Sequence, residues 1–275
     1  MQAKTTEMRL NDLAIPYKWT YHGLSLFMKL SVRHITKQYG EHRVLNDISF
    51  EMPEGKVYVL MGTNGSGKTT LFNILTGFVK QDDGDVLLDG CSINRLSPYQ
   101  RCQKGIGRTF QDLRLVNDHT VRENVLLSFP KQEGEKWWKA LFPVNSVKVE
   151  QNKNRQMADT LLAQCFIDDV ADAKAGEISY GKQKLLNLAC CIACDTPILL
   201  LDEPVAGVNP AYREKLTSVI NNLRKEGKSL IIIEHNRDFI EAVTDKVLFL
   251  HNGSMRHYNN YEDFRNDKEV LNAYI

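Results

Sequence analysis

No apolar run in this sequence approaches the length of a membrane span. Stretches such as residues 198–201 and 230–233 are far shorter than the ~18 apolar residues that a spanning helix requires. Residues 1–27 are interrupted by Pro16 and Lys18 and are followed by no small-residue cleavage site, so we expect no signal peptide. Together these absences predict a cytoplasmic protein.

The sequence also lacks an excess of either charge. It contains 35 Lys and Arg residues against 34 Asp and Glu residues, a net charge of +1. This balance provides no overall field to attract a polyanion, so nucleic acid is not expected as a partner. With 43% hydrophobic residues among 275, the chain can bury one sizeable core and a smaller lobe, but not several independent domains.

Paired cysteines with the spacing of a complete zinc site are missing. Cys191 and Cys194 have the spacing of half such a site, but no second pair lies at a suitable distance in this sequence of six cysteines. Cys190 falls in the same helical-looking run, where cysteines act as small apolar side chains. Core packing in a reduced compartment is therefore the favoured interpretation.

The first part of the chain alternates short apolar strands with turns. Strand patterns bounded by Gly- and Pro-containing turns occupy residues 30–35, 48–52 and 57–61. A helix is expected over residues 69–78, where Leu71 and Ile74 recur at helical spacing and Gly77 weakens only the last turn. The predicted order is strand, glycine-rich segment, helix.

The rest of the chain changes to helices and then returns to strands. Residues 112–194 contain few strand-like runs and show helical spacing at 157–165 and 185–193, so we expect a helical lobe. Apolar strands then follow at 198–201, 230–233 and 247–250, with a helix over 212–225. This strand–helix–strand order predicts an α/β protein with a parallel sheet.

The glycine-rich segment matches the pattern G-x4-G-K-[ST] between a strand and a helix. Its residues are Gly62, Thr63, Asn64, Gly65, Ser66, Gly67, Lys68 and Thr69. We expect the adjacent Thr70 to bind the nucleotide as well. In this context backbone N–H groups converge on phosphate oxygens. We expect Lys68 to pair with the β- and γ-phosphates of ATP and the Thr69 hydroxyl to ligate Mg2+. A glycine-rich turn without a ligand is the alternative.

Two carboxylates end a later apolar strand. Asp202 and Glu203 follow residues 198–201, which places charge at the carboxyl edge of the sheet, where ligands of open α/β folds bind. We expect Asp202 to hold Mg2+ through water, and Glu203 to polarise the water that attacks the γ-phosphorus. A solvated turn is the alternative, but the glycine-rich segment favours function. The two segments predict a nucleoside triphosphatase.

A third segment carries a family signature. Residues 178–183, I-S-Y-G-K-Q, open a predicted helix and resemble the L-S-G-G-Q signature of ATP-binding cassette (ABC) proteins, in the variant with an aromatic third residue. In that family the signature contacts the γ-phosphate of ATP held by the opposite subunit, which suits anion binding at a helix start. The resemblance implies a trans site formed by Ser179, Tyr180, Gly181, Lys182 and Gln183. Ser179 and Gly181 would be its phosphate contacts.

Two further polar residues fall in the order expected for the family. Gln111, which follows Arg108-Thr-Phe, resembles the Q-loop and implies binding to Mg2+ or to the attacking water. His235, which follows I-I-I-E, resembles the switch histidine, and implies a hydrogen bond to the γ-phosphate that orients Glu203 and water. Taken singly, either would more often be an ordinary polar residue.

Two other positions resemble elements of the family at the nucleotide and at the dimer seam. Tyr39 sits where the family stacks an aromatic on adenine, although a tyrosine packed in the core at a strand end is the alternative. Asn209 stands in a D-loop-like string where the usual residue is aspartate. We infer neutral hydrogen bonding at that point of the seam.

The resemblance covers nearly the whole chain. It implies an α/β P-loop NTPase cassette with a RecA-like core, an antiparallel β subdomain and a helical signature subdomain. We place the cassette at residues 28–275, with its core at 28–111 and 195–275 and its helical lobe at 112–194. Residues 1–27 match nothing, and we interpret them as a start-site artefact, a flexible tail or a regulatory arm.

Several strings narrow the resemblance to the ATPase subunits of branched-chain amino acid importers, and urea and amide importers share much of them. They are residues 107–111, 120–125, 179–183, 202–207 and 270–274. A lipopolysaccharide-export ATPase shares the D-E-P-x-A-G-V string, and the soluble ATPase of iron–sulfur cluster assembly is also a single cassette. Both remain alternatives, whereas a module that senses ATP without turnover is disfavoured by Glu203 and His235.

The resemblance also implies partners. A second cassette chain, identical or a sister subunit, would close on ATP; integral membrane permease subunits would dock near residues 112–125, and a solute-binding protein would act indirectly. We therefore expect a peripheral location at the cytoplasmic face of the cell membrane. Trp137 and Trp138, between two lysines, could bind a partner or a membrane, but packing on their own lobe is favoured.

Overall fold

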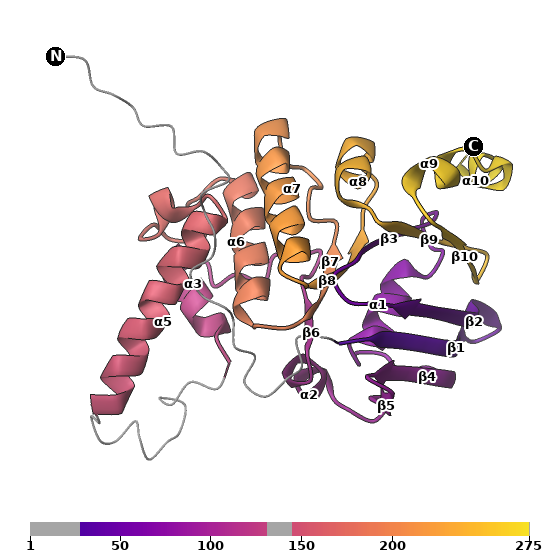
Figure 1. Cartoon of the computed structure of the whole chain (residues 1–275), viewed down its shortest axis with the longest axis horizontal. Coiled ribbons are helices and arrows are strands. Elements are labelled where there is room, and N and C mark those ends of the chain that lie inside the picture. Colours follow the sequence, from indigo (N-terminus) through magenta and orange to yellow (C-terminus); the bar gives the residue numbers. More distant parts are fainter. Residues whose placement is uncertain (1–27, 131–144, 275) are drawn as a thin grey trace.

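The computed structural model describes residues 28–130 and 145–274. The predictions for residues 1–27 and for the segment containing Trp137 and Trp138 lie outside this range. Figure 1 shows two sheets, with helices gathered mainly at one end of the molecule. Within the described ranges, none of the helices has both the length and the apolar character of a bilayer-spanning segment.

A six-stranded sheet with the order β10-β9-β3-β8-β7-β6 lies at the centre of the fold. Its strands are β3 (Val57–Met61), β6 (Ile106–Arg108), β7 (Ile198–Asp202), β8 (Ser229–Ile233), β9 (Lys246–His251) and β10 (Ser254–Tyr258). Neighbouring strands are parallel except for β9 and β10. Strands β3, β7 and β8 are buried along their whole length, as expected for parallel strands covered on both faces. The predicted parallel sheet is confirmed.

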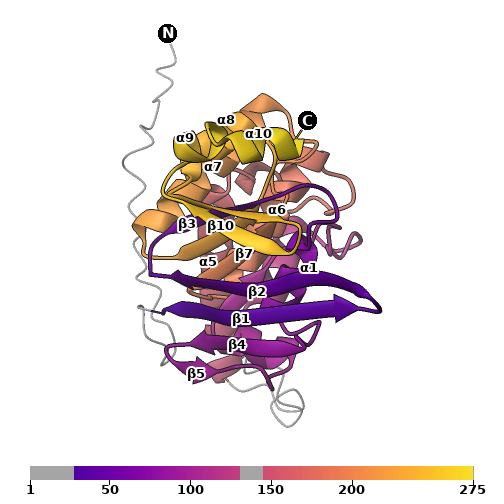
Figure 2. The ribbon, with the colours of Figure 1, turned by 90° about the vertical axis from the view of Figure 1, so that its right-hand side faces the viewer.

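A second sheet is antiparallel and has the order β2-β1-β4-β5 (Figure 2). Its strands are β1 (Leu30–Tyr39), β2 (His42–Met52), β4 (Asp83–Leu88) and β5 (Cys91–Ser92). It corresponds to the antiparallel β subdomain that the family resemblance implied. Two short helices, α9 (Tyr261–Arg265) and α10 (Lys268–Tyr274), follow β10 at the other end of the chain.

Strand β3 directs alternate side chains into two apolar clusters, one on each face of the central sheet. Val57 and Val59 join one cluster, and Tyr58 and Leu60 join the other. Helix α1 (Lys68–Leu75) packs into the second cluster, whereas the first receives α6 (Tyr180–Ala193), α7 (Pro210–Lys225) and α8 (Arg237–Val243). The helix after the glycine-rich loop and the helix that begins at the signature therefore lie on opposite faces of the sheet.

The helices between residues 112 and 194 pack side by side (Figure 1). They are α3 (Val121–Ser128), α5 (Asn145–Gln164), the short 3-10 helix η2 (Asp168–Val170) and α6. Their buried residues Val125, Leu161 and Leu185 belong to the same apolar cluster as Val59 of the sheet. These helices therefore share one core with the sheet, and the division of the chain at residues 112 and 194 remains a prediction.

The helical cysteines line this shared core. Cys191 belongs to the buried cluster and Cys190 packs against it, which confirms the core-packing interpretation for these two residues. Burial raises the pKa of the Cys191 thiol to about 12 and that of Cys190 to about 11. Both side chains are therefore protonated and unreactive at neutral pH.

The predicted end of the helix after the glycine-rich loop is wrong. Helix α1 ends at Leu75 instead of Phe78, and Gly77 does more than weaken its last turn. Gly77 adopts a φ of +80°, and a Cβ at this position would lie 2.8 Å from Nε of Arg101. Gly77 therefore stops the helix and leaves room for a side chain from α2 (Pro98–Gln103).

Arg101 of α2 occupies that room and is only 2% exposed. Its Nη1 donates to the carbonyl oxygens of Ile74 and Leu75 at 2.5 and 3.0 Å, and its Nε donates to Leu96 at 3.2 Å. The carbonyls of Ile74 and Leu75 lie in the last turn of α1, and that of Ile74 also accepts from the N–H of Gly77 at 3.1 Å. Burial lowers the pKa of Arg101, but the carbonyl dipoles stabilise its charge.

We expect Arg101→Met to lower the free energy of unfolding by about 2–4 kcal/mol, because it removes a buried donor that the carbonyl oxygens of Ile74, Leu75 and Leu96 share. Urea denaturation followed by circular dichroism measures the loss. Arg95 is exposed, and Arg95→Met is the matched control, with an expected change within about 0.5 kcal/mol. Equal losses in the two variants would contradict the role given to Arg101.

Candidate nucleotide-binding site

Three parallel strands end level with one another at one edge of the central sheet. Leu60 of β3 pairs with Ile233 of β8, and Ile233 pairs with Asp202 of β7. The residues that follow these strands are the glycine-rich loop, Glu234 with His235, and Glu203. Segments far apart in the sequence therefore meet at the carboxyl edge of the sheet, where open α/β folds bind ligands.

The glycines of the loop allow the backbone to make close approaches. Gly62 and Gly67 have φ values of +155° and +103°. A Cβ at Gly62 would lie 2.2 Å from the carbonyl oxygen of Leu250, and one at Gly67 would lie 2.9 Å from Cδ2 of Leu45. Gly67 is the N-cap of α1 and has no side chain to bond the first amides of the helix. These amides can therefore serve as phosphate donors.

Lys68 lies buried beneath this loop. Its Nζ donates to the carbonyl oxygens of Gly62 and Thr63 at 2.7 and 2.9 Å. Burial lowers the pKa of Lys68, and the charges of Glu203 and Asp202 act in the opposite direction. The ammonium group therefore lies within electrostatic reach of both carboxylates that the sequence predicted for the site.

The remaining side chains of the loop differ in exposure. Asn64 and Thr69 are exposed, so the Thr69 hydroxyl is accessible at the first turn of α1. Ser66 is buried, and its Oγ finds no hydrogen-bond partner among the described residues. A buried hydroxyl without a partner is a natural contact for a polar ligand. Thr70 is half-buried at the start of the same helix.

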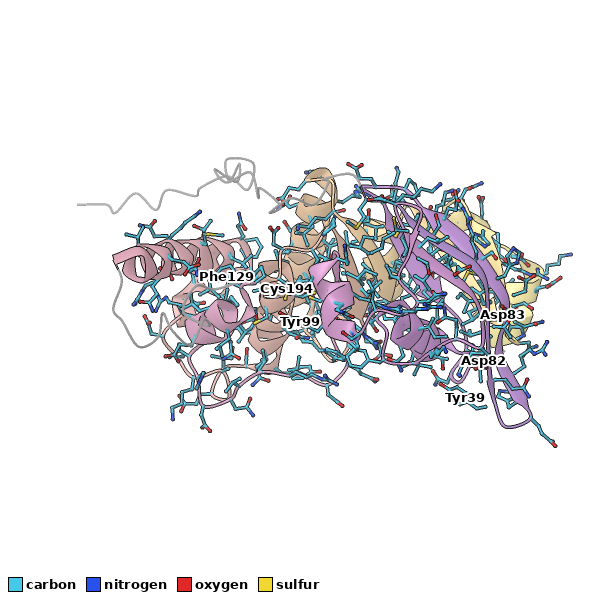
Figure 3. The ribbon with its side chains drawn as sticks, turned by 90° about the horizontal axis from the view of Figure 1, so that it is seen from below. Tyr39, Asp82, Asp83, Tyr99, Phe129 and Cys194 are labelled. Carbon is cyan, nitrogen blue, oxygen red and sulfur yellow. The ribbon has the colours of Figure 1, made fainter. Side chains whose placement is uncertain are left out.

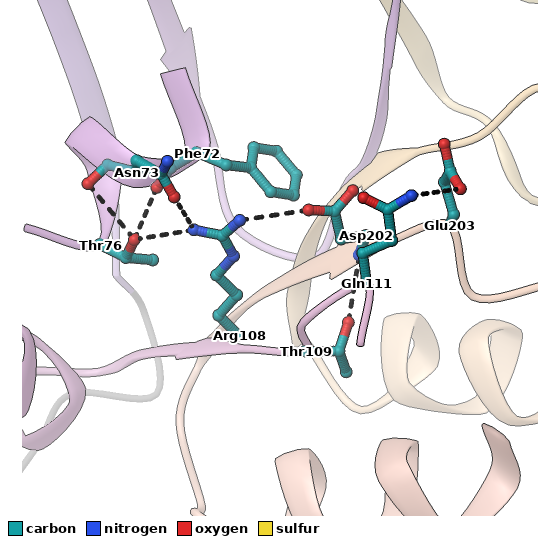
Figure 4. Close-up of polar contacts among 8 residues, drawn as sticks. All are labelled: Phe72, Asn73, Thr76, Arg108, Thr109, Gln111, Asp202 and Glu203. Atoms are coloured by element: carbon teal, nitrogen blue, oxygen red, sulfur yellow. Dashed lines mark hydrogen bonds and ion pairs between the residues drawn. The ribbon is translucent and has the colours of Figure 1, made fainter. Parts of the chain in front are cut away.

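Arg108 connects Asp202 to the helix that follows the loop (Figure 4). Its Nη2 lies 3.1 Å from Oδ2 of Asp202, and both side chains are 6% exposed. Its Nη1 donates to Oδ1 of Asn73 at 2.6 Å and to Oγ1 of Thr76 at 3.3 Å. The main-chain N–H of Asp202 also donates to Thr109 Oγ1 at 3.1 Å. Asp202 is therefore held in one orientation at the end of β7.

Glu203 and Gln111 lie next to each other. Nε2 of Gln111 lies 3.4 Å from Oε2 of Glu203, and Gln111 is exposed (Figure 4). Glu203 has a φ of +48°, a left-handed conformation that few residues other than glycine adopt. Its N–H donates to Ile233 at 2.9 Å, and its carbonyl oxygen accepts from Lys184 Nζ at 3.0 Å. The structure thus brings two of the predicted catalytic residues together.

His235 is exposed beside this group, on a loop that Glu234 holds in place. Glu234 is buried, and its Oε1 accepts from the N–H groups of His235 and Asn236 at 3.0 and 3.3 Å. Its Oε2 accepts from the N–H of Val205 at 3.3 Å. Glu234 therefore ties the segment that carries His235 to the segment that follows Glu203.

Tyr39 ends β1 and is 49% exposed, so the alternative of a core tyrosine is wrong. It lies at the hairpin formed with β2, far from the helical lobe (Figure 3). Nζ of Lys37 lies 5.2 Å from the centre of its ring. Strand β2 contacts the glycine-rich loop through Val44 and Leu45. The exposed ring of Tyr39 therefore lies on the pair of strands, β1 and β2, that lines the loop.

The signature residues begin α6, on the face of the sheet opposite α1. Ser179 is the exposed N-cap of α6, and its side chain makes no capping bond. Lys182 Nζ lies 2.5 Å from Oδ2 of Asp169, and Gln183 Nε2 donates to the carbonyl of Ala175 at 2.9 Å. When residues 178–182 are aligned with L-S-G-G-Q, Lys182 occupies the position of the glutamine. The side chains of Lys182 and Gln183 both bond to residues of their own helical lobe.

Tyr180 and Gly181 pack against the segment that contains Asn209. A Cβ at Gly207 would lie 3.1 Å from the ring of Tyr180, and a Cβ at Gly181 would lie 2.6 Å from the ring of Tyr212. Asn209 is the N-cap of α7, and its Oδ1 accepts from the N–H of Tyr212 at 3.1 Å. Signature and D-loop thus form one continuous surface, and the amide of Asn209 caps its own helix.

Sequence reasoning missed three buried charged residues of the site, namely Arg108, Lys184 and Glu234. Arg108 belongs to the string at residues 107–111, and a charged residue directly after an apolar position in a short strand is a signal of a buried polar contact. Lys184 lies among apolar positions of α6, which is a similar signal. Charged side chains are rarely buried without a partner.

Comparisons with known proteins agree with this arrangement. The sequence model of the ABC transporter family matches residues 45–206. The high-affinity branched-chain amino acid transport ATP-binding protein BraF of Pseudomonas aeruginosa is 31% identical over 247 residues, which cover 90% of this chain and 97% of that protein. LivG of Escherichia coli, which carries the same description, is 32% identical over the same shares.

The fold is similar to that of solved ATP-binding cassettes. A nucleotide-free ATP-binding cassette from an ABC transporter has a TM-score of 0.77 and 30% sequence identity, and the match covers 90% of this chain and 99% of that chain. These likenesses confirm the predicted fold class and the predicted class of enzyme, an ATPase coupled to transport. The chain belongs to the ABC transporter family.

Proposed function

We propose that this chain is the ATP-hydrolysing motor subunit of a membrane importer for branched-chain amino acids or a related small polar solute. The observation that carries the proposal is the meeting of the loop around Lys68 with Gln111 and Glu203 at one edge of the central sheet. The substrate class is supported by two relatives that are named for branched-chain amino acid transport.

In this proposal the glycine-rich loop holds the phosphates of ATP. The ammonium group of Lys68 leaves the carbonyl oxygens of Gly62 and Thr63 and turns toward the β- and γ-phosphate oxygens. Hydrogen bonds to these anionic oxygens are stronger than those to neutral carbonyls. The first amides of α1 add donors at a helix N-terminus. The exposed ring of Tyr39 offers a face on which adenine can stack.

The residues present also fit a magnesium ion. Thr69, Gln111 and Asp202 offer hydroxyl, amide and carboxylate oxygens, the donors that Mg2+ prefers. Asp202 is fixed by Arg108, and Thr69 is exposed on the first turn of α1. When bound, the ion would neutralise charge on the β- and γ-phosphates. Few protein carboxylates are needed, because Mg2+ commonly keeps water and phosphate ligands.

Glu203 is the proposed general base. Its carboxylate lies beside Gln111, so both side chains can hydrogen-bond to one water placed in line with the γ-phosphate. His235 follows Glu234 on the neighbouring strand end, where it can donate to the developing charge on the transferred group. The left-handed backbone of Glu203 turns its side chain out of the strand and toward this water.

The second half of each site comes from another cassette chain, identical or a sister subunit. Ser179 and the uncapped start of α6 offer donors for the γ-phosphate of the partner's ATP. Closure on ATP and reopening after hydrolysis would move the permease subunits. Residues 112–125 are the proposed docking site, at the cytoplasmic face of the membrane, and a solute-binding protein would act on the other side.

An aromatic pair next to Gln111, of which Phe78 is exposed and Phe110 half-buried, suits this docking. Phe78 is 50% exposed, and its ring contacts that of Phe110 with centroids 5.7 Å apart. The guanidinium of Arg114 lies 3.5 Å from the centre of the Phe110 ring. An exposed apolar surface rimmed by charge is typical of a protein interface, and its place beside Gln111 would connect the permease to the nucleotide.

We expect Lys68→Ala to reduce ATP binding or turnover by roughly 100-fold or more, because it removes a charge that stabilises the phosphates. Binding of a fluorescent ATP analogue and steady-state hydrolysis by the purified chain measure the loss. Lys56 forms a half-exposed ion pair with Asp245, and Lys56→Ala is the matched control with activity close to wild type. ATP binding and hydrolysis that both stay at wild-type levels in Lys68→Ala would contradict the proposed cradle.

Glu203→Gln should keep ATP binding but slow hydrolysis by roughly 100-fold or more, because the amide cannot accept a proton from water. The variant should also trap the closed dimer with ATP, which gel filtration detects. Glu214→Gln, an exposed change on α7, should leave both properties unaltered. Undiminished hydrolysis by Glu203→Gln would refute the base assignment.

Transport itself is tested by the proteins that co-purify with the tagged chain from detergent-solubilised membranes. We expect permease subunits together with a solute-binding protein. A soluble scaffold in place of permeases would favour the iron–sulfur cluster assembly class. Permeases of an export system, without a solute-binding protein, would favour the lipopolysaccharide-export class.

A further inference from the structure

Lys184 is a buried cation, and apolar packing alone does not account for an ammonium group at this position. It lies in the first half of α6 and is 4% exposed. Its Nζ donates to the carbonyl oxygen of Glu203 at 3.0 Å and lies 5.7 Å from the centre of the Tyr180 ring. A buried ammonium group is unfavourable unless such contacts stabilise it. The contact with Glu203 joins the signature helix to the proposed general base of the same chain.

The main chain of Glu203 is held from two sides. Its N–H donates to Ile233 of β8 at 2.9 Å, and its carbonyl oxygen accepts from Lys184. The φ of +48° at Glu203 is unfavourable for a residue with a side chain, so the surrounding contacts must maintain it. Removing the Lys184 donor leaves this backbone held mainly through its N–H, so the residue that carries the carboxylate can shift.

The other contact of Lys184 leads to the surface that faces a partner chain. Tyr180 carries its ring against Gly207, where a Cβ would lie 3.1 Å away, and Gly181 lies against Tyr212. The ammonium of Lys184 therefore contacts both an aromatic ring of the signature and the backbone that carries Glu203. A displacement of the first turn of α6 would be transmitted directly to the Glu203 peptide.

We propose that Lys184 is a positioning residue that couples the signature surface to the orientation of Glu203 within one chain. This inference rests on the proposed role of Glu203 as the base. When the signature engages the partner's nucleotide, the first turn of α6 is fixed, and Lys184 fixes the Glu203 peptide with it. The hydrolytic carboxylate of each chain is thereby aligned when its own signature is occupied.

The test is steady-state hydrolysis by the full-length chain carrying Lys184→Met, which keeps the apolar stem and removes the donor and the charge. We expect kcat to fall roughly 10- to 100-fold, as for a misplaced catalytic group, with KM for ATP unchanged. Lys184→Arg keeps a cationic donor and should retain most of the rate. A wild-type kcat in Lys184→Met, or an equal loss in Lys184→Arg, would overturn the proposal.

Lys215→Met is the matched control. Lys215 Nζ lies 5.5 and 5.1 Å from the rings of Phe166 and Tyr212, so it is a lysine on aromatic rings in the same region without a contact to Glu203. We expect kcat of this variant to match wild type. A loss equal to that of Lys184→Met would assign the effect to general packing and overturn the proposal.

Hydrogen–deuterium exchange separates this inference from the proposed function. Without nucleotide, Lys184→Met should speed amide exchange within residues 203–207 and leave the strands of the central sheet unchanged. Unchanged exchange at 203–207, or faster exchange throughout the chain, would overturn the positioning role. If the wild-type chain hydrolyses no ATP, the proposed function fails, and the exchange result alone decides the role of Lys184.

Discussion

Strands β3, β8 and β7 end level with one another, and the position of the site depends on this register. The pairing of Leu60 with Ile233, and of Ile233 with Asp202, places three loop starts at one edge of the sheet. A slip of one residue in β7 would turn its side chains to the opposite face of the sheet. Because these strands are buried on both faces, such a slip would disrupt two apolar clusters, and the register is firmly specified.

Buried cations join the helices to this edge. Arg101 secures the end of α1, Arg108 links α1 to Asp202, and Lys184 links α6 to the backbone of Glu203. Arg101 and Lys184 donate to main-chain carbonyl oxygens, whereas Arg108 bonds to the side chains of Asp202, Asn73 and Thr76, so each has little freedom to rearrange. Removing one partner of such a contact leaves the other desolvated and unsatisfied, which is more unfavourable than the loss of an exposed pair. The site is therefore held by directional polar contacts set within an apolar frame.

The sequence predicted much of this frame because strong periodicity marks buried elements. The apolar strands β3, β7 and β8 and the amphipathic helix α7 were found where expected. Strand β4 begins with Asp83, Gly84 and Asp85 and so lacks an apolar run, and the two-residue strand β5 is too short to show a pattern. The loop around Lys68 and the carboxylates were readable because their chemistry requires fixed spacings. The contacts of Arg108 and Lys184 join residues distant in sequence, and no local pattern encodes them.

The packing of Tyr180 on Gly207 has a consequence for engineering. The aromatic ring fills space that exists because residue 207 has no side chain and adopts a φ of +71°. A signature of the usual glycine-containing kind, transplanted alone into this chain, would leave that surface uncovered. A D-loop with a larger residue at position 207, transplanted alone, would collide with the ring. In chimeric cassettes built from this chain, the two segments must therefore be exchanged together, as one module formed by distant parts of the sequence.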